Sequence, residues 1–167
     1  MPNTQPANDS VATTEFILQK AQEASIEVLP IAAVTMNQAG EELVQFETLV
    51  KAGVVAFSDD GKPVANSELM RRALEICGRL RVPVIDHCED PALAHGAVIN
   101  EGVISSTLKV RGMPSEAEEI MVSRNILLSK LTNQHVHMRM ATISGQFLRR
   151  TNFFAALPCK ENVFLQL

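Results

Sequence analysis

The chain has 167 residues, which is enough for one hydrophobic core and favours a single domain. Hydrophobic residues make up 46% and charged residues 20%, a balance that is typical of globular proteins and excludes wholesale disorder. Aromatic residues are only 4% and the formal net charge is -4, whereas a nucleic-acid binder usually carries stacking aromatics and a basic face. We therefore expect no nucleic-acid partner.

The cysteines and the N-terminal segment bear on the compartment. Cys77, Cys88 and Cys159 lack disulfide-framework or CxxC spacing, which favours a reducing compartment. No apolar run approaches the length of a membrane span, and MPNTQPANDS has no features of a signal peptide. The sequence predicts a cytoplasmic protein with no membrane partner.

Four short apolar segments are predicted to be strands. They are residues 28–35, 54–58 and 82–86, with a weaker candidate at 135–138. Continuous runs rich in Val and Ile are typical of strands that are buried on both faces, as in parallel sheets.

Helical patterns lie between these segments. Residues 12–24 and 40–51 are predicted helices, and the apolar stripe over 67–80 predicts a helix capped by Asn66 or Ser67. A last helix is expected over 114–132, where Ser115 and Glu118 have capping-box spacing. A long loop is expected before it.

The alternation of helix and strand predicts an α/β fold with parallel strands. Such a sheet is either open and doubly wound or part of a (β/α)8 barrel. The phosphate-binding glycine motifs of nucleotide-binding open sheets are absent, and polar residues follow each strand, as at the catalytic edge of a barrel. A whole barrel usually needs about 250 residues, so this chain is too short for one.

Two polar clusters at strand ends could bind a metal. Asp59 and Asp60 follow the strand at 54–58, and His87 follows the strand at 82–86 beside Asp86. Carboxylate and imidazole from neighbouring strand ends suit zinc or another divalent metal, which would polarise a carbonyl and activate water. The alternatives are a simple turn for the aspartates and a hydrogen-bonded structural role for the histidine.

Three further side chains lie near these clusters or on the last predicted strand. His135 and His137 could add ligands because alternate residues of a strand point the same way, or they could be polar residues of a strand edge. Cys88 lacks a base partner, so nucleophilic catalysis by this thiol is not expected.

Six motifs together resemble dihydroorotases of the long bacterial type, within the amidohydrolase superfamily: MPNT, VLPIAAVT, AGVVAFSDDGKPV, LMRRALEICGRLRVPVIDHCEDPALA, GAVINEG and GMPSEAEEIMVSRNILL. The resemblance implies a zinc-dependent (β/α)8 barrel that interconverts N-carbamoyl-L-aspartate and dihydroorotate in pyrimidine biosynthesis. It implies that Asp60 and His87 are zinc ligands and that Asn3 contacts the substrate carboxylate. The FSDDG motif favours this family over allantoinase-like relatives.

The chain also departs from the family pattern. The HxH strand that precedes MPNT and the later strand with the general-base aspartate are absent. His137 fits the first histidine of the family's H-x-x-H-x-S strand, but Met140, or Thr142 in a shifted alignment, stands at the position of the metal-binding histidine. We therefore expect the chain to form the middle βα units of the barrel and to be inactive by itself.

The same departures set the expected domains and partners. Residues 1–137 are expected to form the partial barrel, and 138–167 a divergent tail. An incomplete barrel exposes strand edges, which favours self-association. Because some family members assemble with aspartate transcarbamoylase, a non-catalytic chain that binds this enzyme is the alternative.

Overall fold

A computed structural model describes residues 1–139 and 163–166, the latter as a backbone strand. The elements run in chain order as α1 Val11–Ala21, β1 Ile31–Ala32, the 3₁₀ helix η1 Met36–Gln38, α2 Phe46–Lys51, β2 Ala56–Phe57, α3 Ser67–Leu80, β3 Val84–His87, α4 Pro91–Ala94, β4 Ile99–Asn100, α5 Val103–Leu108, β5 Gly112–Met113, α6 Glu116–Thr132, β6 Val136–Arg139 and β7 Val163–Gln166.

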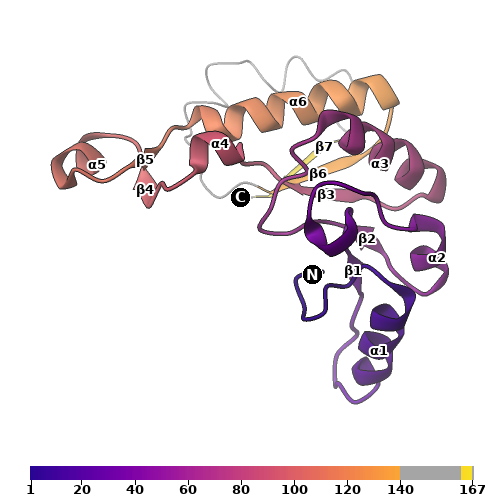
Figure 1. Ribbon diagram of the computed structural model, residues 1–167. Helices are drawn as coiled ribbons and strands as arrows, with labels where there is room; N and C mark the ends of the chain where they lie inside the picture. Colours follow the sequence, from indigo (N-terminus) through magenta and orange to yellow (C-terminus); the bar gives the residue numbers. More distant parts are fainter. Residues whose placement is uncertain (140–162, 167) are drawn as a thin grey trace.

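The main sheet has five strands in the order β1-β2-β3-β6-β7, and every neighbouring pair is parallel (Figure 1). Spatial order follows chain order, with no point at which it reverses. A doubly wound sheet reverses its order at a switch point, whereas a (β/α)8 barrel adds each strand on the same side of the one before it. The predicted α/β class is confirmed, and the strand order favours the barrel alternative.

The register decides which side chains share a face of the sheet. Val84 lies opposite Val136, and His87 lies opposite Arg139. In both strands burial alternates, with Val84 and Val136 fully buried. Since neighbouring residues of a parallel pair point the same way, His87 and Arg139 lie on one face, at the carboxyl end of the sheet.

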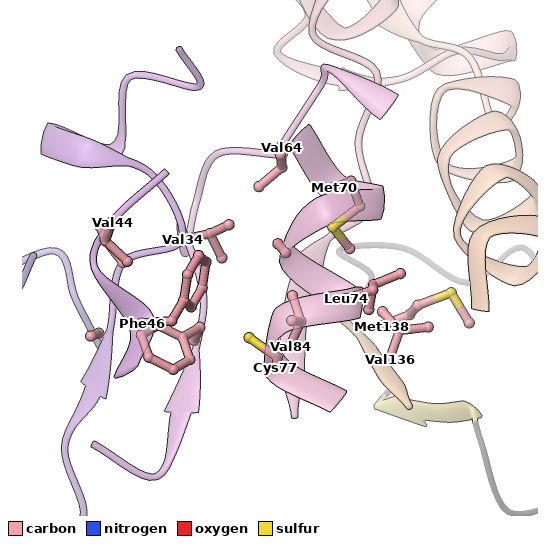
Figure 2. Packing of buried hydrophobic residues seen from close by; sticks show 14 of the residues in the cluster. Val34, Val44, Phe46, Val64, Met70, Leu74, Cys77, Val84, Val136 and Met138 are labelled. Atoms are coloured by element: carbon pink, nitrogen blue, oxygen red, sulfur yellow. The ribbon is translucent and has the colours of Figure 1, made fainter. Parts of the chain in front are cut away.

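The core lies between the strands and the helices. Figure 2 shows Met70, Leu74 and Cys77 of α3 in the same cluster as Val84 and Met138. The apolar stripe of α3 causes this arrangement, and Asn66 begins the helix by accepting hydrogen bonds from two backbone amides. In the part of the chain that the structure describes, every helix is too short or too polar to cross a membrane.

Several predicted boundaries were wrong. The first two strands are much shorter than predicted because hydrogen bonds to loops and side chains replace strand pairing at their ends. The predicted capping box is absent: Ser115 precedes α6 in a helical conformation, and its hydroxyl donates to Glu116 Oε2 at 3.3 Å. Asn66, not Ser67, caps α3.

The predicted long loop contains structure of its own. The β4–β5 pair and α5 form an arm that extends away from the main sheet (Figure 1). Gly112 makes this pairing possible, because a Cβ there would lie 2.4 Å from the Cα of Glu101. The two-residue strands lacked the length that a sequence pattern needs for prediction.

Candidate functional site

The two predicted metal ligands lie at the carboxyl end of the main sheet. Asp60 follows β2 by three residues, and His87 is the last residue of β3. Arg139 ends β6, lies opposite His87 in the register, and contacts Asp60 through its guanidinium. Asp60 and Arg139 are therefore in contact at this end of the sheet, and the register places His87 on the strand position beside Arg139.

Asp60 forms an ion pair with Arg139. The Arg139 Nη1 group donates to Asp60 Oδ1 at 2.6 Å. The Asp60 side chain is only 10% exposed, whereas the Arg139 side chain is 52% exposed. The carboxylate is thus largely shielded from water by a cation that itself reaches solvent.

The two ring nitrogens of His87 make no hydrogen bond to the residues that the structure describes. Its Nε2 lies 3.6 Å from Glu89 Oε2, longer than a hydrogen bond. Its Nδ1 is buried and has no hydrogen-bond partner among the described residues. A buried imidazole nitrogen without a partner is costly, and it fits a ligand that has yet to bind.

Asp59 does not face the site with Asp60. It is buried, and it accepts hydrogen bonds from the Val34 amide (2.8 Å), the Thr35 amide (3.1 Å) and the Thr35 hydroxyl (2.6 Å). Burial raises the pKa of this carboxyl group, and the hydrogen bonds from Thr35 and Val34 oppose the rise. Asp59 ties the end of β2 to the end of β1 and so fixes the turn that carries Asp60.

The stability contributed by Asp59 is expected to depend on pH. Its pKa is raised from the usual 3.8, so the folded chain binds this proton more tightly than the unfolded chain. The contribution is fully present below pH 3.8 and is lost as pH rises through the raised native pKa. Urea unfolding of the wild type and of Asp59→Asn should show a wild-type advantage that shrinks from acid to neutral pH. An advantage that grows over this range would contradict the assignment.

Asp86 is also structural. It is buried and accepts hydrogen bonds from Arg124 Nη2 (3.0 Å), Asn125 Nδ2 (2.7 Å) and the Val64 amide (3.2 Å). Burial raises the pKa of Asp86, and the Arg124 charge is the largest influence opposing this. Because Asp86 precedes His87, this network joins α6 to the end of β3 and orients the histidine.

Sequence reasoning missed Arg124 and Asn125. Arg124 also donates to the carbonyls of Val64 (2.7 Å) and Ala65 (3.2 Å), so it fastens the loop before α3. The sequence did contain one signal for a buried polar pair: Arg124 and Asn125 are followed directly by the apolar residues 126–128 of the predicted helix. That signal is ambiguous, because arginine usually lies at the surface.

Asn3 and His135 are two further residues that the sequence singled out. Asn3 is exposed and its side chain has no hydrogen-bond partner among the described residues; its segment is held beside β1 by Asn8, whose carbonyl accepts from the Ala33 amide at 2.8 Å. His135 lies at the opposite end of β6 and lines a cavity of about 350 Å³ with Pro83 and neighbours. It therefore lies next to the end of β6 that is away from Arg139, the residue opposite His87 in the register.

His137 lies opposite Ile85, two residues before the end of β6. It is half-buried on the same face as His87, one layer deeper in the sheet. The structure keeps it near the site without placing it at the edge that Asp60 and Arg139 share.

Cys88 lies next to His87 as a buried thiol. It is buried, and its sulfur accepts a hydrogen bond from Asn125 Nδ2 at 3.3 Å. Burial raises its pKa, so the reactive thiolate is disfavoured. Asp90 caps α4 through hydrogen bonds from the amides of Ala92 and Leu93.

The residues present fit a zinc site only in part. Among residues 1–139, no group of three or more His, Cys, Asp or Glu side chains could hold a metal ion. A catalytic zinc usually has three protein ligands and a water, so Asp60 and His87 alone do not complete one. Met140 and Thr142, considered for the ligand position of the sixth strand, lie outside the described residues.

Comparisons with known proteins agree on one family. The family model for dihydro-orotase-like proteins matches residues 1–145. The dihydroorotases of Syntrophobacter fumaroxidans and Syntrophus aciditrophicus are each 47% identical over 146 residues, which is 87% of this chain. These residues are 33% and 34% of the two relatives, so the chain spans about a third of their length.

The fold has a counterpart among solved structures. The chain superimposes on the L-hydantoinase (dihydropyrimidinase) from Arthrobacter aurescens with a TM-score of 0.65 at 12% identity, over 99% of this chain and 38% of that one. This likeness confirms the predicted fold, a partial (β/α)8 barrel. The sheet order, the strand-end residues and the family match lead to one conclusion: the chain belongs to the dihydro-orotase-like family.

Proposed function

We propose that this chain is the middle part of a dihydroorotase barrel. In that role it supplies Asp60 and His87 as zinc ligands and Asn3 as a contact for the substrate carboxylate, in the interconversion of N-carbamoyl-L-aspartate and dihydroorotate. The observation that supports the proposal is that Asp60 and His87 both lie at the carboxyl end of the main sheet, in a chain 47% identical over 146 residues to a dihydroorotase. The setting would be pyrimidine biosynthesis in the cytoplasm.

The surrounding structure supports these two ligands. A buried aspartate precedes each of them in the chain: Asp59 precedes Asp60, and Asp86 precedes His87. Each buried aspartate is held by at least three hydrogen bonds to neighbouring elements. These hydrogen bonds hold the backbone directly before Asp60 and His87, and a metal site needs its ligands to be held rigidly in this way.

The 167-residue chain alone is proposed to be inactive. Two ligands hold zinc poorly, and one of them is paired with Arg139. Purified chain with added zinc should therefore show no hydrolysis of dihydroorotate above the uncatalysed rate. Turnover that Asp60→Ala abolishes would overturn the proposed inactivity and leave the ligand assignment standing.

A chimera tests the family activity itself. Residues 1–137 would replace the matching third of the Syntrophobacter fumaroxidans dihydroorotase, which supplies the rest of the barrel. We expect the chimera to catalyse the reaction, and Asp60→Asn or His87→Ala to lower kcat/KM at least about 100-fold, since even the hydrogen-bond partners of metal ligands are worth about 10- to 100-fold.

The matched control is Glu75→Gln in the same chimera. It also removes one carboxylate that is paired with an arginine, but at an exposed position on α3. Its activity should equal that of the unmodified chimera. An active chimera that tolerates Asp60→Asn as well as Glu75→Gln would refute the ligand assignment.

The alternative function is a non-catalytic chain that binds aspartate transcarbamoylase. The Arg139–Asp60 ion pair favours it, because a carboxylate held by arginine has no need of a metal. Sedimentation of the purified chain with and without aspartate transcarbamoylase tests it. A stable complex from a chain that shows no turnover would favour this alternative.

A further inference from the structure

The guanidinium of Arg139 occupies the position at which a metal would contact Asp60. Its Nη1 lies 2.6 Å from Asp60 Oδ1, and the register places the same residue opposite His87. A cation that binds Asp60 Oδ1 would have to compete with this guanidinium. The site therefore already holds one positive charge supplied by the chain.

We propose that Arg139 acts as an internal cation that takes the place of the metal on Asp60 and keeps divalent ions out of this site. The inference rests on the proposed ligand role of Asp60 and His87.

Charge and hydrogen bonding explain how the exclusion works. The Asp60 carboxylate is 10% exposed, so it needs a positive partner, and Arg139 already satisfies it. A zinc ion would have to break this hydrogen-bonded pair and would also be repelled by the guanidinium. Because an arginine side chain stays charged at all ordinary pH values, the competition persists.

The pairing is reversible, because the Arg139 side chain is 52% exposed. It can therefore turn toward solvent when a metal binds. The Asp60–Arg139 pair should thus lower the affinity of the chain for zinc without abolishing it. A variant without the guanidinium should bind zinc more tightly than the wild type. His87 Nδ1, which is buried and has no partner among the described residues, would remain for the metal.

Zinc titration of the full chain against a chromophoric chelator tests the proposal. Arg139→Gln should bind zinc about fivefold more tightly than the wild type, the change that corresponds to the upper range of a solvent-exposed ion pair. Arg139→Lys, which keeps the charge, should stay close to the wild type. Arg71→Gln is the control, because it removes one positive charge from an exposed ion pair on α3 and should change nothing.

A second substitution identifies the site of any gain. Asp60→Asn in the Arg139→Gln background should cancel the gain, and the double variant should match Asp60→Asn alone. Thermal unfolding monitors folding, and Arg139→Met provides a second variant without the positive charge should Arg139→Gln unfold.

Two outcomes would overturn the inference. If the wild type and Arg139→Gln bind zinc equally and Asp60→Asn weakens both, Asp60 is a ligand but Arg139 does not exclude the metal. If the gain in Arg139→Gln survives Asp60→Asn, the zinc is held elsewhere. The chimera of residues 1–137 lacks Arg139, so its activity decides the proposed function independently.

Discussion

Replacing Arg124 with methionine is expected to lower the free energy of unfolding by about 3 kcal/mol, the range found when one partner of a buried ion pair is removed. Arg124 is 14% exposed and its partner Asp86 is 1% exposed, so the substitution leaves a buried carboxylate without its positive partner. It also leaves the carbonyl of Val64 without its side-chain donor. Urea unfolding followed by circular dichroism measures the loss.

Two comparisons isolate the charge from the lost packing. Arg72→Met removes an arginine from an exposed helix pair with Glu68 and should cost less than about 1 kcal/mol. Asp86→Asn in the Arg124→Met background removes the uncompensated charge and should recover about 1 kcal/mol or more. A double variant less stable than Arg124→Met would contradict the charge argument.

The pH dependence follows from the same pair. The Arg124 charge opposes the rise in the pKa of Asp86 that burial causes, so removing Arg124 raises this pKa further. A higher native pKa means that stability falls as pH rises through it. The deficit of Arg124→Met should accordingly be smaller at pH 4 than at pH 7.

The sequence predicted the elements and the edge of the sheet where the site would lie. Helix 67–80 was predicted at its observed bounds because its stripe of apolar residues has helical spacing and Asn66 begins it. The strands were recognised by their Val and Ile content, but their ends were not. The backbone there bonds to side chains such as Asp59, and no local pattern encodes those partners.

The arrangement within the site was less predictable. Asp59 and Asp60 are identical in type and adjacent in the chain, and only the backbone of the loop after β2 directs one toward Val34 and Thr35 and the other toward Arg139. Arg139 and Arg124 were missed because their partners lie 79 and 38 residues away in the chain. Long-range pairing of this kind follows from the register of the strands and the packing of α6, which periodicity does not specify.

Replacing Phe57 with alanine is expected to lower the free energy of unfolding by about 3–4 kcal/mol, the usual cost of removing a buried phenylalanine. Phe57 is fully buried, and its ring packs edge to face on Phe46 with the centroids 4.6 Å apart. The loss combines buried apolar surface with the cavity left between β2 and α2. Chemical unfolding at neutral pH measures it.

Phe16→Ala is the control, because this phenylalanine on α1 is 59% exposed and its removal should cost less than about 1 kcal/mol. Phe57→Leu, which keeps most of the volume, should cost about 1.5 kcal/mol or less. A loss of less than about 1 kcal/mol for Phe57→Ala would mean that the ring is not packed as observed. Since Phe57 precedes Ser58, Asp59 and Asp60, its packing is also what anchors the strand end that presents Asp60 to Arg139.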